Sequence, residues 1–190
     1  MTVIIKPLSR SELTIEVDYK STPVKDTAMQ LFALSAQYFN TFEFDDPKKA
    51  KDTYINMAEM GENLRQAIRE SILKDPKKEN IEYWIDVMND LFAKGDFSLS
   101  IDIGLVLKEL EPKRDLQQVF SEVSPEKLSC LNTRKEEVTD LPAFPIGRIM
   151  RANFYEKERP DAAIANMQLY ITRSSSFFTL TNQSCDISVL

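Results

Sequence analysis

The sequence predicts an all-α protein built as one multi-helix domain. Helix-start signals recur along the chain, each an aspartate, serine or threonine followed by proline. The stretches between these signals carry apolar residues at helical spacing. A length of 190 residues, 43% of them hydrophobic, provides one core rather than two. We expect an extended N-terminal segment over residues 1–22, a helical domain over residues 23–173 and an irregular Ser/Thr-rich tail over residues 174–190.

The N-terminal segment has the period of a strand. In the stretch SELTIEVDYK, apolar or aromatic residues alternate with polar ones at Leu13, Ile15, Val17 and Tyr19. Residues 9–12 also fit the pattern of a helical capping box. We expect residues 3–19 to be extended.

The helical domain is divided by four start signals, at Thr22-Pro23, Asp46-Pro47, Asp75-Pro76 and Ser124-Pro125. Apolar residues at helical spacing fill AMQLFALSAQYF, residues 50–73, IEYWIDVMNDLFA and SLSIDIGLVLKEL. We interpret Asp45 and Asp46 as part of a helix cap rather than an acid–base pair, because proline follows them directly. Trp84 and Ile85 are predicted to lie in the core, and Phe97 to anchor the start of the helix that follows it.

The tail is rich in Ser, Thr and β-favouring residues and has no helical period after Ile171. Its sequence fits either a packed strand or a loose segment. The two cysteines, Cys130 and Cys185, are too few and too far apart to indicate a disulfide framework or a zinc site. We expect both to be ordinary small side chains in a reducing compartment.

Charge and hydropathy narrow the classes of partner. The net charge of −6 and the sequence pI near 4.9 argue against binding of nucleic acid, which usually requires a basic surface. No stretch approaches the roughly 18 apolar residues of a membrane span, and the first residues lack the layout of a secretory signal. The sequence therefore predicts a soluble, cytoplasmic protein without a membrane span.

The residues that are absent exclude most enzyme classes. The chain contains no histidine, so hydrolases and metal sites built on imidazole are excluded in their usual form. Its four glycines, Gly61, Gly95, Gly104 and Gly147, spell neither a dinucleotide-binding nor a phosphate-binding loop. We expect no cofactor, no metal and no small-molecule substrate.

The stretch FPIGRIMRANFYEKERP, residues 144–160, carries two rows of side chains at helical spacing. One row is apolar, with Ile146, Ile149, Met150 and Phe154. The neighbouring row contains Gly147, Arg151, Phe154 and Glu158. The pattern fits a buried helix, in which Phe154 is a core residue and Glu158 a solvated helix end. It also fits a helix that packs on one face and acts on a partner protein with the other.

Three stretches, taken in order, resemble a known family. ENLRQAIRESIL, IEYWIDVMNDLFAKGDFSLSIDI and LPAFPIGRIMRANFYEKERP are similar to parts of the catalytic domain of Ras-type guanine-nucleotide exchange factors. AMQLFALSAQYF is similar to the opening segment of that domain. The resemblance covers residues 24–171 and implies an all-helical fold whose partner is a small GTPase of the Ras superfamily.

The third stretch resembles the helix that begins the hairpin with which the family opens the GTPase. By this resemblance Phe154 stands where an apolar residue intrudes on the magnesium site, and Glu158 stands at the acid that displaces phosphate. Arg151 and Tyr155 fall at positions that contact the GTPase. Catalysis of this kind forms no covalent bond, so the chain is expected to be neither a hydrolase, a transferase nor an oxidoreductase.

The sequence departs from the family pattern at several points. Gly95-Asp96-Phe97 stands in place of Asn-Asn-Phe, and Arg159 replaces the glycine that follows the acids. The stretch DAAIANMQLYI is short for the second helix of the hairpin. A noncatalytic helical adaptor that kept the fold is therefore the alternative to an exchange factor. The chain is also shorter than the usual catalytic domain of the family, which suggests a minimal or divergent member, such as a bacterial effector that acts on GTPases in the cytosol of a host cell.

Overall fold

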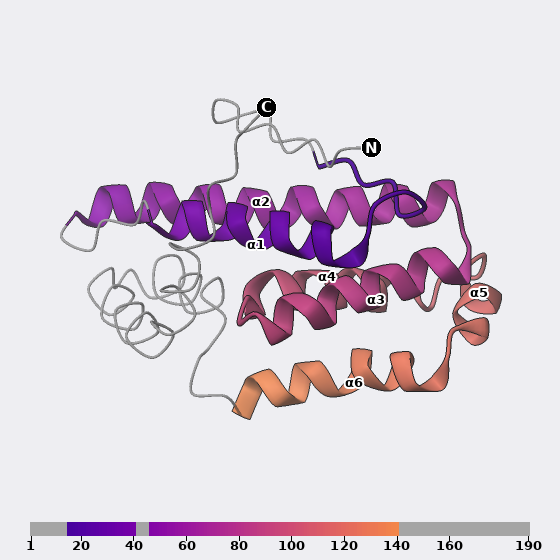
Figure 1. The fold of residues 1–190 in the computed structure, drawn as a ribbon. Coiled ribbons are helices and arrows are strands. Elements are labelled where there is room, and N and C mark those ends of the chain that lie inside the picture. Colours follow the sequence, from indigo (N-terminus) through magenta and orange to yellow (C-terminus); the bar gives the residue numbers. More distant parts are fainter. Residues whose placement is uncertain (1–14, 41–45, 141–190) are drawn as a thin grey trace.

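The structure is a computed structural model that describes residues 15–40 and 46–140 (Figure 1). These residues form α-helices and contain no strand. The helices are α1 (Val24–Asn40), α2 (Pro47–Lys74), α3 (Lys78–Ala93), α4 (Phe97–Leu110), α5 (Gln117–Glu122) and α6 (Pro125–Asp140). The all-α class predicted from the sequence is confirmed for this part of the chain. No described helix is both long and apolar enough to cross a membrane.

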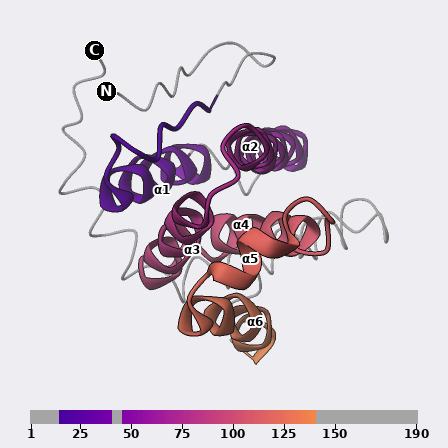
Figure 2. The ribbon, with the colours of Figure 1, turned by 90° about the vertical axis from the view of Figure 1, so that its right-hand side faces the viewer.

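The helices form three layers. In Figures 1 and 2, α1 and α2 make one outer layer, α3 and α4 the middle layer, and α6 lies on the opposite side. Helix α3 contacts each of the other five helices, and α4 contacts α2, α3 and α6. The middle layer is thus covered on two sides, which makes α3 the centre of the core.

The core confirms the predicted position of α3. Trp84 and Ile85 are fully buried, as are Ile81 and Met88 on the same helix to within 1%. Tyr83 contacts Trp84 edge to face and shares a buried hydrogen bond between its hydroxyl and that of Thr27 on α1. This bond satisfies two polar groups that would otherwise be costly to bury.

Helix α2 begins as the sequence predicts. The Asp46 side chain accepts hydrogen bonds from the backbone N–H groups of Lys48 and Lys49, at 3.0 and 3.2 Å, and Pro47 occupies the first helical position. Along the helix a single row of fully buried apolar residues faces inward: Met60, Leu64, Ile68 and Ile72.

The prediction that Asp75 starts a helix is wrong. Asp75 is the C-cap of α2, where its backbone N–H donates to the carbonyl of Ser71, and α3 begins only at Lys78. The buried Asn80 explains the geometry, because its side-chain amide donates to the carbonyls of Ser71 and Asp75 at 3.0 and 3.1 Å. These bonds satisfy carbonyls that the end of a helix leaves open.

The remaining helix starts predicted from the sequence agree with the structure to within one residue. Gly95 takes a positive φ of 85°, which ends the turn after α3, and the Asp96 side chain caps α4 through the N–H of Leu99. Phe97 begins α4 and packs edge to face on Phe92, as expected for an anchor. Helix α6 follows Ser124 directly, whereas α1 begins at Val24, one residue past Pro23. The sequence did not predict α5.

The described part of the N-terminal segment shows the predicted alternation but no strand. Ile15 is buried and Val17 and Tyr19 are half-buried, while Glu16 and Asp18 are exposed. A turn follows from Tyr19, held by bonds to the Asp18 carbonyl, so the extended stretch ends slightly earlier than predicted. The segment packs three apolar side chains against the helices.

Candidate functional site

The four residues predicted to act on a partner are Arg151, Phe154, Tyr155 and Glu158, and all lie outside the described residues. The same holds for Gly147, for the predicted second helix of the hairpin and for the tail with Cys185. Their roles remain predictions. Polar side chains gather at several places in the described residues, among them a corner between two helices, a surface pocket and a contact between two helices.

The first is the corner between α2 and α3, where Asp75 collects three donors. Its carboxylate accepts from the Tyr19 hydroxyl at 2.8 Å and lies 2.6 Å from the Lys20 ammonium and 3.3 Å from that of Lys77. The bond to Lys20, followed by that to Tyr19, lowers the pKa of Asp75 to about 2. The carboxylate therefore holds the N-terminal segment at this corner, and its charge is already paired with Lys20 and Lys77.

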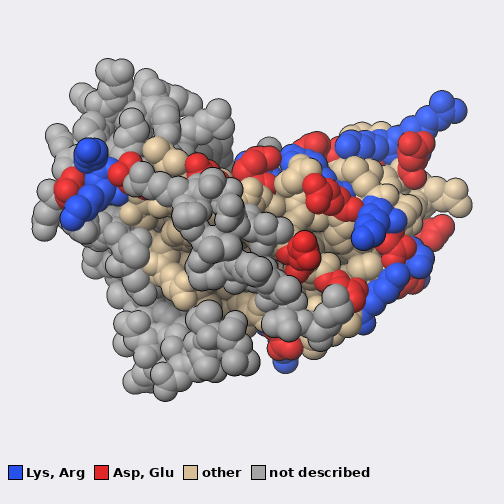
Figure 3. Space-filling model, turned by 90° about the horizontal axis from the view of Figure 1, so that it is seen from above, with Lys and Arg blue, Asp and Glu red and all other residues tan. Residues whose placement is uncertain are grey.

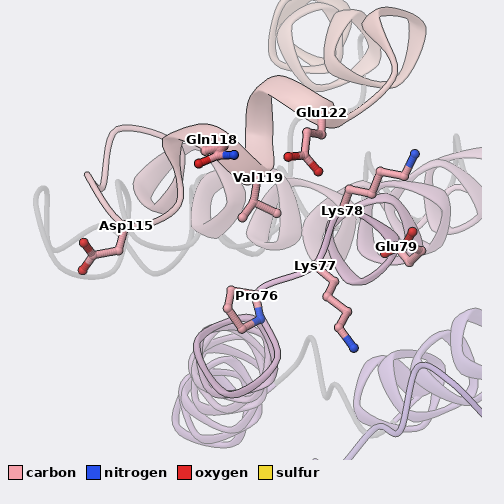
Figure 4. Close-up of a pocket in the computed structure, with 8 residues that line it drawn as sticks. All are labelled: Pro76, Lys77, Lys78, Glu79, Asp115, Gln118, Val119 and Glu122. Carbon is pink, nitrogen blue, oxygen red and sulfur yellow. The ribbon is translucent and has the colours of Figure 1, made fainter.

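The second place is a surface pocket beside this corner (Figure 4). It encloses about 300 Å³ and opens to solvent between the start of α3 and α5. Its lining residues are Pro76, Lys77, Lys78, Glu79, Asp115, Gln118, Val119 and Glu122. Charges of both signs line it, and Figure 4 shows Lys77 extending away from α5. The pocket lacks the single-sign field that would select a phosphate or a cation.

The third place is the contact between α2 and α4, which we call the charged seam: Glu62, Arg65, Arg69, Asp102 and Glu109. Arg69 pairs with both oxygens of Glu109, at 2.8 and 3.3 Å, and reaches Glu62 at 3.4 Å. Arg65 lies between Glu62 and Asp102, with a 2.9 Å bond to the latter. The two glutamates are at least half exposed, and their pKa values are lowered by bonds to Arg65 and Arg69.

Asp102 differs from the glutamates because it is pressed against the backbone of α2. A Cβ added to Gly61 would lie 2.5 Å from Asp102 Oδ2 and 3.3 Å from its Cγ. The glycine therefore makes room for the carboxylate between the two helices. Burial raises the pKa of Asp102 to about 6, although Arg65 opposes the shift.

Asp96, at the start of α4, is a buried carboxylate, whereas Asp102 is partly exposed. It is 7% exposed, and its Oδ1 accepts from the N–H of Leu99 at 3.1 Å. Burial raises its pKa to about 6, while the Leu99 N–H and the Ser35 hydroxyl oppose the shift. No described residue places a basic side chain on it. The cap thus carries its charge, when ionised, in an apolar setting.

These clusters limit the chemistry of the described helices. The part of the chain that the structure describes contains no group of three or more acidic, cysteine or histidine side chains placed to hold a metal. Acidic and basic side chains are interspersed at the end that holds the α2–α3 corner (Figure 3). The seam and the corner pair their charges internally, which is the arrangement of a structural contact rather than of a catalytic centre.

Sequence reasoning missed both the seam and the role of Asp75. Arg65 and Asp102 are 37 residues apart, so no local pattern connects them. One signal was present: an isolated glycine inside a long helix, here Gly61, is typical of a close approach by another element.

Comparison with known proteins gives no relative for this chain. No protein-family model, no curated protein and no solved structure shows a significant match.

Proposed function

We propose that the chain is a guanine-nucleotide exchange factor for a small GTPase of the Ras family, which promotes GDP release by inserting a helical hairpin near the nucleotide site. The proposal rests on the resemblance of three stretches, in order, to the exchange-factor domain. The GTPase-facing residues in it are Phe154 and Glu158, with Arg151 and Tyr155 as contacts.

The observation that carries the proposal is the packing of the first two of these stretches. The first is residues 62–73, which end α2, and the second is residues 81–103, which cover most of α3 and the start of α4. These helices contact one another and contribute to a single core cluster. Stretches that resemble parts of one domain therefore fold as one unit, as a member of such a family requires.

The proposed mechanism needs only noncovalent chemistry. A carboxylate brought to the phosphate site repels the phosphates and competes for the same backbone donors, which is the role assigned to Glu158. An apolar side chain beside the magnesium site, here Phe154, disfavours the ion. The factor lowers the barrier to release because it binds the nucleotide-free GTPase more tightly than the loaded one.

A noncatalytic adaptor is the second candidate, and two sequence features favour it. Arg159 stands where the family has glycine after the acids, and DAAIANMQLYI is short for the second helix of the hairpin. An adaptor would keep the interaction with the GTPase and lose the power to open it.

The two candidates are separated by nucleotide release from a panel of small GTPases. Each GTPase is loaded with a fluorescent guanine nucleotide and mixed with the full chain and excess unlabelled nucleotide. Exchange activity predicts a severalfold faster release from at least one member. Binding to a GTPase without faster release would favour the adaptor, and neither binding nor release across the panel would contradict both.

A further inference from the structure

The described part of the N-terminal segment lies on the helices but belongs to none of them. In Figures 1 and 2 it runs over the outer face of the layer formed by α1 and α2 before it turns into α1. Ile15 is 5% exposed and is part of the core cluster, and Val17 and Tyr19 pack against the same cluster. The segment therefore covers apolar surface that the described helices do not cover themselves.

A single carboxylate at the α2–α3 corner supplies the polar attachment of this segment. Asp75 accepts a hydrogen bond from the Tyr19 hydroxyl at 2.8 Å and lies 2.6 Å from the Lys20 ammonium. The same ammonium lies 5.5 Å from the centre of the Tyr19 ring. That ring packs on Tyr83 of α3, with ring centroids 6.1 Å apart. Tyr19 and Lys20 thus form one anchor, aromatic towards α3 and cationic towards Asp75.

The segment is held less firmly than the helices. Among the described residues, no backbone hydrogen bond joins residues 15–17 to a helix. The side chains of Lys20 and Asp75 are 58% and 26% exposed, and an ion pair this open to water contributes little and weakens with salt. A segment held by a few side chains and one anchor opens more readily than a helix of the core.

The turn that follows the segment allows it to leave as a unit. The Asp18 carbonyl accepts from the backbone N–H groups of Ser21 and Thr22 at 3.1 and 2.9 Å, and the Asp18 carboxylate accepts from the Ser21 hydroxyl at 2.7 Å. All these bonds lie within the turn. Departure of the segment therefore costs its apolar contacts and its anchor, but no hydrogen bond inside a described helix.

We propose that residues 15–20 form a detachable clasp over a docking surface. The clasp opens while the helices stay folded, and the surface beneath it then takes an extended segment of a partner protein. The clasp itself defines the chemistry of that segment: apolar side chains at alternating positions, then an aromatic residue and a cation that pairs with Asp75. In the closed state the chain occupies its own docking surface. The clasp does not depend on the exchange activity proposed above.

The closed state dominates because the clasp is tethered. A segment on a short connection acts at an effective concentration on the order of millimolar, so a free segment of the same sequence competes poorly with it. Loss of the apolar side chains of the clasp removes this competition and leaves the surface beneath unchanged. Binding of a free peptide therefore reports whether the surface is open.

A fluorescent peptide with the sequence of residues 12–22, ELTIEVDYKST, tests the docking surface. Its binding is measured by anisotropy with the full chain and with a double variant, Ile15→Ser with Val17→Ser. The double variant should bind the peptide about tenfold more tightly than the parent, or better still, because its own clasp no longer competes. A peptide that carries the same two serines is the matched control and should bind neither chain.

Asp75→Asn, added to the double variant, should lower the affinity for the peptide severalfold, because asparagine keeps the shape but loses the charge that pairs with Lys20. Asp115→Asn, at an exposed position, should leave the affinity unchanged. Circular dichroism checks that each variant keeps its helices. Equal affinity of the parent and a helical double variant would overturn the proposal, and so would a helical double variant that binds no peptide.

Opening of the clasp is also measured without altering its apolar side chains. Trypsin cleaves after Lys20 only when the clasp leaves the helices, and mass spectrometry follows that one bond in the full chain. Asp75→Asn should speed this cleavage severalfold, whereas Asp115→Asn should not change it. Cleavage of the Asp75→Asn chain at the parental rate would show that the anchor does not hold the clasp, and would overturn the proposal even if the double variant fails to fold.

Discussion

Helices α3 and α2 both contact α4, but they do so with different chemistry. Helix α3 has 16 residues and buries eight of them, seven of which are apolar or aromatic. Helix α2 has 28 residues, buries one narrow row of apolar side chains and meets α4 through the charged seam. The α3 contact excludes water by apolar packing, whereas the α2 contact combines a small residue, Gly61, with ion pairs.

The difference indicates where the stability of the fold lies. Burial of apolar surface contributes roughly 25 cal/mol per Å², independently of pH. Exposed ion pairs such as Arg69–Glu109 typically contribute about 0–1 kcal/mol and weaken with salt. The apolar contacts of the middle layer should therefore contribute most of the free energy of unfolding. The charged seam should contribute only a small part of it.

The largest effect is expected at the centre of α3. Trp84→Ala should lower the free energy of unfolding by about 3 to 5 kcal/mol, because it leaves a large cavity among fully buried neighbours. Denaturant unfolding measures it. Among the described residues the Trp84 indole N–H has no hydrogen-bond partner, so Trp84→Phe should lose clearly less. A loss below about 1 kcal/mol for Trp84→Ala would contradict the assignment of α3 as the centre of the core.

A smaller effect is expected where α2 approaches α4. Gly61→Ala should destabilise by about 1 to 2 kcal/mol, because the new Cβ displaces Asp102 and strains its bond to Arg65. The gain in helix propensity offsets part of this loss. On an Asp102→Ala background the same change should become neutral or stabilising. An equal loss on both backgrounds, measured by denaturant unfolding, would break the link between the glycine and the carboxylate.

The sequence predicted the apolar elements because periodicity is local. The spacing of Trp84 with Ile81, Ile85 and Met88 places one face of α3 inside, and Asp46 before Pro47 caps α2 through its own neighbours. Helix α5 escaped prediction because it is six residues long and lacks a side-chain cap bond. Local information of this kind recovered the helices that form the core, but not how they are arranged in layers.

The features that the sequence did not predict depend on contacts between residues far apart along the chain. Asp75 followed by proline resembles a helix start. In the structure, however, the Asn80 side-chain amide donates to the Asp75 carbonyl, and the Tyr19 hydroxyl donates to the Asp75 carboxylate. The bond from Arg65 to Asp102 likewise joins two helices that local sequence cannot align. The residues proposed to act on a GTPase lie beyond residue 140, outside the described part of the chain, so their prediction rests on resemblance.

The proposed opening of a GTPase by the carboxylate of Glu158 is tested most directly by Glu158→Ala. Melting temperature and nucleotide release are measured together, with Phe154→Ala in parallel and Lys157→Ala as a neighbouring control. We expect Glu158→Ala to leave stability within about 0.5 kcal/mol but to slow release severalfold or more, because the lost interaction forms only with the opened GTPase. Phe154→Ala should slow release and also lower the melting temperature if its ring packs in the core. A Glu158→Ala chain that exchanges nucleotide at the parental rate would contradict the claim.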